Sequence, residues 1–141
     1  MKTKLLAICF FLSSSQVFAE NICSGEYPNV CDIAKDTQKK FAETLPQKLS
    51  NNLLLEKVSS FENTLYIYAK LLYSKKYLED RVKKADMLMS DINLRMKLST
   101  QNTVCSSKLT RKFIMSGGVV NYIYHFQNGE KYLSINVKQC N

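Results

Sequence analysis

The stretch from residue 119 to residue 137, VVNYIYHFQNGEKYLSINV, predicts a β-hairpin near the end of the chain. Two runs of alternating apolar and polar residues flank Asn128-Gly129, a dipeptide typical of two-residue type I′ turns. Pairing across that turn places Phe126 opposite Lys131 and Tyr124 opposite Leu133. One face is then apolar and should lie against the core: Val120, Tyr122, Tyr124, Phe126, Leu133, Ile135 and Val137. The other face can meet solvent: Asn121, Ile123, His125, Tyr132, Ser134 and Asn136.

A second hairpin is expected upstream of the first. Residues 53–58 form a short apolar run, and residues 59–63 resemble a turn. Residues 64–73, TLYIYAKLLY, are dense in the aromatic and branched side chains that favour strands.

Helices are expected in three places. Asn29 can cap a helix that has Asp32 in its first turn and ends before Pro46. The segment from Tyr77 to about Val104 predicts one long helix, because apolar residues recur there at helical spacing: Leu78, Val82, Ala85, Met89, Ile92 and Met96. Residues 108–115 predict a last short helix. Four further apolar residues flank the long stripe and could extend the core or form a dimer face: Met87, Leu88, Leu94 and Leu98.

The order α-β-β-α-α-β-β predicts the α+β fold class. Strands do not alternate with single helices, as they do in parallel sheets. We therefore expect one antiparallel four-stranded sheet made of two hairpins, with the helices packed on one face.

The N-terminus predicts an export signal. Lys2 and Lys4 precede an apolar run at residues 5–12 that is too short to span a bilayer, and Val17 and Ala19 fit a cleavage site after Ala19. The expected division is a signal peptide at 1–19 and a single disulfide-stapled domain at 20–141. No later run approaches the ~20 apolar residues of a membrane-spanning helix. The leader fits a bacterial exporter, with the protein periplasmic or secreted.

Four cysteines follow the expected cleavage site: Cys23, Cys31, Cys105 and Cys140. An even count in a small exported domain indicates two disulfides, although four cysteines allow three connectivities. We favour Cys23 with Cys31 and Cys105 with Cys140, because this pairing requires no long-range coincidence.

Residues for catalysis are scarce. His125 is the single histidine and has no activating neighbour in sequence, and disulfide-bonded cysteines leave no nucleophilic thiol. No cysteine pair has the two-residue spacing of a zinc site, and no glycine-rich phosphate loop with its lysine is present. We therefore expect neither an enzyme nor a metal or cofactor site.

The charge suggests how the protein meets its neighbours. The formal net charge is +8 at pH 7, or about +6 without Lys2 and Lys4 of the leader. Such an excess favours an anionic surface, while export argues against nucleic acid. Two sets of residues are candidates for binding a partner. The first is the basic stretch Lys75, Lys76, Arg81, Lys83 and Lys84, and the second is the outer sheet face at Ile123, His125 and Tyr132.

A longer pattern runs from Leu45-Pro46 to the last cysteine. A helix ends in Leu-Pro, a strand carries Tyr-x-Tyr, and a helical stretch reaches a cysteine. Gly-Val then precedes a second Tyr-x-Tyr strand, a polar-Gly turn and a final cysteine. The residues that carry the pattern are Leu45, Pro46, Tyr66, Tyr68, Cys105, Gly118, Val119, Tyr122, Tyr124, Asn128, Gly129 and Cys140.

This pattern resembles a group of small exported bacterial proteins of mostly unassigned function. The resemblance implies a Cys105–Cys140 bridge and an α+β order, and it brings no catalytic residues. The chain departs from the group at Gln47-Lys48-Leu49, where the group continues with methionines, and in its additional pair Cys23 and Cys31.

The sequence therefore predicts a non-enzymatic exported interaction protein. It would be an accessory to a secretion, pilus or conjugation machine, or a virulence-associated secreted factor. Its partner would be a protein in the cell envelope or outside the cell. A periplasmic enzyme inhibitor or immunity protein is the alternative, and a small hydrolase is the third hypothesis.

Overall fold

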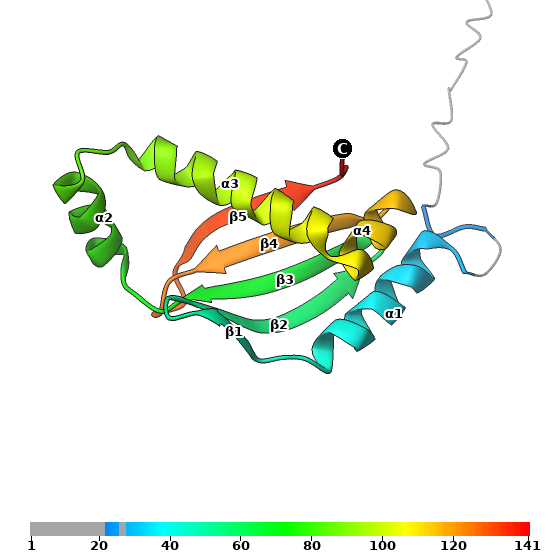
Figure 1. Ribbon diagram of the computed structural model, residues 1–141. Coiled ribbons are helices and arrows are strands. Elements are labelled where there is room, and N and C mark those ends of the chain that lie inside the picture. The colour runs from blue at the N-terminus through cyan, green and yellow to red at the C-terminus, as the bar shows by residue number, and fades with distance from the viewer. Residues whose placement is uncertain (1–21, 26–27) are drawn as a thin grey trace, which may run out of the picture.

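The fold consists of one sheet and a layer of helices across one of its faces (Figure 1). The computed structural model describes residues 22–25 and 28–141, so the leader expected at 1–19 lies outside the described residues. In chain order the elements are α1 (Val30–Ala42), β1 (Gln47–Ser50), β2 (Leu53–Phe61), β3 (Thr64–Leu71), α2 (Lys75–Lys84), α3 (Met89–Ser106), α4 (Lys108–Met115), β4 (Val119–His125) and β5 (Lys131–Val137). None of these helices is long and apolar enough to cross a membrane.

The expected antiparallel four-stranded sheet is wrong, although the α+β class fits. Five strands lie in the order β1-β2-β3-β4-β5, and β3 pairs with β4 in parallel. Each hairpin is antiparallel, as predicted. Between the hairpins the chain runs through α2, α3 and α4, and such a long crossover can return it to the end where β3 began. All four residues of the extra strand β1 are exposed, so it lacks the alternation that reveals a half-buried strand.

The single helix expected from Tyr77 to Val104 is also wrong, because the chain breaks after Lys84. Asp86 adopts a left-handed backbone conformation, with φ 52°, instead of a helical one. The amide of Asp86 donates to the Lys83 carbonyl at 3.2 Å, and that of Met87 donates to the Val82 carbonyl at 3.1 Å. These two bonds form a Schellman motif, which ends α2. The Asp91 carboxylate then accepts from the Leu88 amide at 3.4 Å as α3 begins.

The turn of the last hairpin differs from the two-residue turn that Asn128-Gly129 predicts. Gly129 has φ 86°, whereas Asn128 is not left-handed, and the Gly129 amide donates to the Phe126 carbonyl at 2.9 Å. The loop therefore has three residues and a left-handed glycine. Tyr124 still pairs with Leu133, but His125 rather than Phe126 lies opposite Lys131. The register shift leaves Tyr132 as an extra residue in β5.

The core lies between the sheet and the helices. Along β3 and β4 every second residue is buried, as the alternation in sequence predicts. The helices contribute Ala34 from α1, Val104 from α3, and Phe113 and Ile114 from α4. Asn29 caps α1 in a capping box with Asp32, as expected.

Substitutions of Asp86 should test the break between α2 and α3. Asp86→Gly should raise the free energy of unfolding by up to ~1 kcal/mol, because glycine has no steric penalty at positive φ. Asp86→Val should lower it by about 1–2 kcal/mol. Urea unfolding of both variants measures the difference, and equal stability of the two would contradict the left-handed assignment.

The buried phenol of Tyr122 should make stability fall at alkaline pH. Burial, together with the neighbouring Tyr124, raises the pKa of Tyr122 well above its ordinary value. The folded chain then retains a proton that the unfolded chain loses, so stability should decline as the pH rises above about 10. The free energy of unfolding of Tyr122→Phe should decline less steeply than that of wild type, by up to ~1.4 kcal/mol per pH unit. Denaturant unfolding across this pH range gives both slopes, with Tyr66→Phe as the control, and identical slopes for wild type and Tyr122→Phe would refute the effect.

Candidate protein-binding surfaces

The predicted basic stretch lies on α2 and is exposed. Lys75 pairs with Glu130 at 3.3 Å and Lys76 with Asp80 at 3.0 Å. Arg81, Lys83 and Lys84 occupy the last turn of the helix. Because α2 ends at Lys84, the helix dipole favours these cations where they lie. Their interaction with the helix dipole therefore explains the position of Arg81, Lys83 and Lys84 without a bound ligand.

The uncovered face of the sheet presents His125 and Ile123, as predicted. His125 Nε2 lies 3.2 Å from Glu56 Oε2 on β2, and its Nδ1 lies 3.2 Å from the Phe126 carbonyl oxygen. Lys70 Nζ lies 3.0 Å from Glu56 Oε1. Glu56 therefore links side chains of three adjacent strands. These groups lie on one face of the sheet and bond to each other.

Tyr132 does not lie on that uncovered face, so its predicted position is wrong. Its ring packs against Phe126 of the core with centroids 5.0 Å apart. Its hydroxyl donates to Asn93 Oδ1 on α3 at 2.6 Å. The extra residue in β5 reverses the direction of this one side chain and turns it toward the helices. The three predicted positions of the sheet face are therefore split between its two sides.

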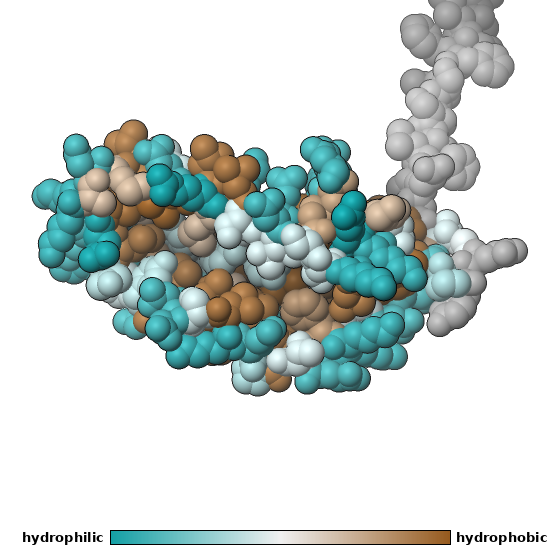
Figure 2. Space-filling view, viewed as in Figure 1, coloured by the Kyte–Doolittle hydropathy of each residue, from teal (hydrophilic) through white to brown (hydrophobic). Residues whose placement is uncertain are grey.

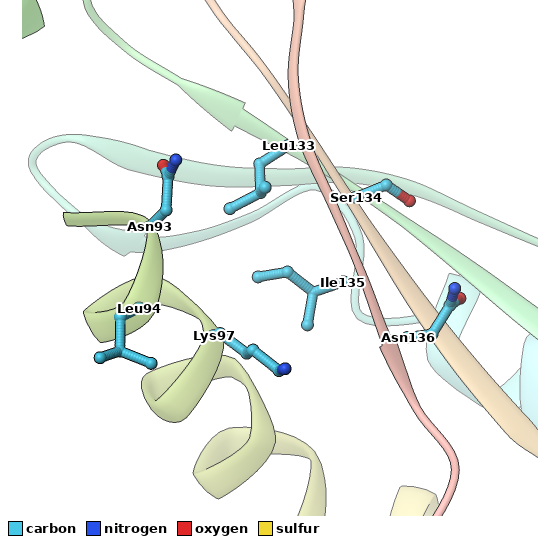
Figure 3. Close-up of a pocket in the computed structure, with 7 residues that line it drawn as sticks. All are labelled: Asn93, Leu94, Lys97, Leu133, Ser134, Ile135 and Asn136. Atoms are coloured by element: carbon cyan, nitrogen blue, oxygen red, sulfur yellow. The ribbon is translucent and has the colours of Figure 1, made fainter. Parts of the chain in front are cut away.

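A groove runs between α3 and β5 and has a volume of about 400 Å³. Leu133 and Ile135 project from β5 toward α3, and Lys97 projects from α3 toward the strand (Figure 3). Ser134 and Asn136 point to the other side of the strand. The residues that line the groove are Asn93, Leu94, Lys97, Leu133, Ser134, Ile135 and Asn136.

The groove continues into a second hollow of about 410 Å³ beyond Lys97 and Asn136, which line both. Gln101, Val137, Lys138 and Gln139 complete its wall. We call the two hollows together the α3–β5 groove. Its described lining residues include two lysines, Lys97 and Lys138, and no acidic side chain.

Specific bonds fix α3 at both ends of this groove. At one end Tyr132 of β5 bonds to Asn93. At the other end Cys105 forms a disulfide with Cys140, just beyond β5, with Cα atoms 5.5 Å apart. Between these points the hydroxyls of Thr100 and Tyr124 share a buried hydrogen bond of 2.7 Å. The second disulfide, Cys23–Cys31, lies at the start of α1, so both bonds match the favoured pairing.

Apolar side chains also gather in the middle of the helix-covered face. Figure 2 shows them between α3 on one side and α1 with β1 on the other, whereas α1 and α2 carry mostly hydrophilic side chains. A hollow of about 190 Å³ lies there and is lined by Phe41, Leu49, Leu55, Val104 and Tyr122, among others. It is smaller than the α3–β5 groove, and Leu55, Val104 and Tyr122 in its wall belong to the core.

The sequence pattern does not predict the α3–β5 groove as a site. Leu94 and Leu98 lie off the main apolar stripe, and both are exposed, by 56 % and 54 %. Of the two, Leu94 lines the groove, and its place off the apolar stripe was the one signal in the sequence, because an apolar side chain away from the buried stripe indicates a surface outside the core. Leu88 is likewise 67 % exposed, so these leucines do not extend the core.

Comparison with known proteins shows the fold. No family model matches the chain, and no curated protein matches it in sequence. A protein of Pseudomonas aeruginosa assigned as secreted has a similar structure, with a TM-score of 0.59 and 12 % identity over 77 % of this chain and 88 % of the other. EpsS, the pilotin of the Vibrio vulnificus type 2 secretion system, has a TM-score of 0.58 and 13 % identity, and the match covers 79 % of this chain and 94 % of EpsS. AspS, the type II secretion system pilotin of Vibrio cholerae, has a TM-score of 0.54 and 11 % identity, and the match covers 77 % of this chain and 87 % of AspS.

A double-mutant cycle should measure the bond that holds α3 to β5. Tyr132→Phe and Asn93→Ala each remove one partner, and each should lower the free energy of unfolding by about 1 kcal/mol. The double variant should lose less than the sum, with a coupling of about 0.5–1.5 kcal/mol. Fully additive losses in urea unfolding would mean that the bond contributes nothing to stability.

Proposed function

We propose that this protein is an exported, non-enzymatic accessory of a bacterial type II secretion system that binds a protein component of that machine in the cell envelope. The observation that carries the proposal is the fold, which this chain shares with two pilotins of such systems over most of both chains. An export leader and two disulfides support an oxidising compartment outside the cytoplasm.

The described surfaces favour binding over catalysis. Glu56, Lys70 and His125 bond to each other, and none of the three lines a described pocket, whereas enzymes hold reactive groups in a cleft. The α3–β5 groove offers apolar and basic side chains suited to a protein segment.

Site-specific photocrosslinking in intact cells of the native host tests the proposal. A photoreactive amino acid would replace Leu94 in the α3–β5 groove, Ile123 on the uncovered sheet face, or Lys84 on α2. We expect at least one position to crosslink to a single envelope component of the secretion machine, identified by mass spectrometry. The three positions serve as controls for one another, because a specific interface reacts at one surface and not at all of them.

Two outcomes would contradict the proposal. Crosslinking to a hydrolase would make the protein an enzyme inhibitor. Crosslinking from no position to any envelope component would remove the accessory role.

A further inference from the structure

The strand β5 is an unpaired edge of the sheet. Among residues 22–25 and 28–141 it pairs only with β4, so one side of its backbone has no partner strand in this part of the chain. Alternate amide and carbonyl groups of an edge strand point away from the sheet and can pair with another chain. With seven residues, β5 is the longer of the two edges, since β1 has four.

This edge forms one wall of the α3–β5 groove, and the groove has a chemical pattern of its own. Leu133 and Ile135 offer an apolar floor, and Leu94 lines the opposite wall. Lys97 stands at the middle, where the two hollows meet, and Lys138 lies in the second hollow. An occupant therefore needs apolar side chains on one face and negative charge near the centre and one end.

The width of the groove is set before anything binds. The Tyr132–Asn93 hydrogen bond and the Cys105–Cys140 disulfide hold α3 beside β5 at the two ends. A preorganised site avoids the cost of ordering its walls when the ligand arrives.

We propose that the α3–β5 groove binds an extended acidic and apolar segment of a protein partner, which adds to β5 as a sixth strand. The peptide backbone would pair with the free edge of β5. Its alternate apolar side chains would pack on Leu133, Ile135 and Leu94, and its carboxylates would pair with Lys97 and Lys138. The inference rests on the proposed function only in taking the partner to be a protein of the envelope machine.

Two other occupants fit the groove less well. A helix satisfies its own backbone hydrogen bonds, so it would leave the edge of β5 unpaired. A second copy of this chain would bring Lys97 and Lys138 against the same two lysines, without a carboxylate in the described lining to oppose them.

Designed peptides test the inference on the mature, oxidised protein. The probes are nine-residue peptides in which aspartate or glutamate alternates with valine, isoleucine or leucine. A matched set has lysine in place of each acid. We expect the acidic set to include binders with micromolar Kd, and the lysine set to bind at least tenfold more weakly. Hydrogen exchange should show new protection at amides of β5 in the complex.

Two modifications separate strand addition from simple charge attraction. N-methylation of alternate peptide bonds removes backbone donors without changing any charge. Methylation of the amides that face β5 should abolish binding. Methylation of the other, alternate set of amides should leave binding nearly unchanged. Lys97→Glu should weaken binding at least tenfold, whereas Lys35→Glu, a charge reversal at an exposed lysine of α1, should change it by less than twofold.

Four results would overturn the inference. These are no binding at millimolar peptide, equal binding with either set of amides methylated, protection that lies outside β5 and α3, or concentration-dependent dimerisation that protects β5 without peptide. Lys97→Glu also separates this inference from the proposed function. If the variant still crosslinks through Ile123 or Lys84 to an envelope component, the accessory role stands and the groove is not the site. If the peptides bind as expected but no envelope component is crosslinked, the groove stands and the accessory role fails.

Discussion

The disulfide between Cys105 and Cys140 is the constraint on which the position of α3 beside β5 depends. The helix α3 has 18 residues, yet only Thr100 and Val104 are buried. Most helices in small domains are held by a broad apolar face. That of α3 is narrow: Val104 is buried, and Met96 and Cys105 pack against the core only partly buried. By the loop-entropy estimate, a bridge that closes a loop of 35 residues contributes about 4 kcal/mol. Together with the bonds from Thr100 and Asn93 to the sheet, it keeps a mostly exposed helix in place.

This arrangement links the compartment to the surface that the protein presents. The disulfide requires an oxidising environment, which export provides. Because specific bonds hold α3, its exposed leucines need not pack into the core, and a groove stays open beside β5. The same crossover that carries α3 makes β3 and β4 parallel, so the second hairpin extends the sheet and leaves β5 at its edge.

Local patterns in the sequence predict local structure well. The capping box of α1, the pairing of Tyr124 with Leu133 and the alternation of β3 and β4 all follow from nearest neighbours and period. The parallel pairing of β3 with β4 depends on contacts between distant segments, for which one sequence has no signal. Asp86 ends a helix at a position where glycine is the usual residue. Tyr132 is an extra residue in β5, so its side chain turns to the other face although the sequence around it alternates regularly. The groove was missed for the same reason, since it joins a helix and a strand that are separated by α4 and β4.

Hydrogen exchange of a disulfide variant tests the central claim most directly. The variant Cys105→Ala/Cys140→Ala would be compared with wild type and with Cys23→Ala/Cys31→Ala, which removes the bridge beside α1. Our account predicts that loss of Cys105–Cys140 strongly reduces amide protection in α3 and in β5, while α1, β2 and β3 keep theirs. Protection of α3 that is unchanged, or that falls no more than in the Cys23/Cys31 variant, would show that apolar packing rather than this bond holds the helix.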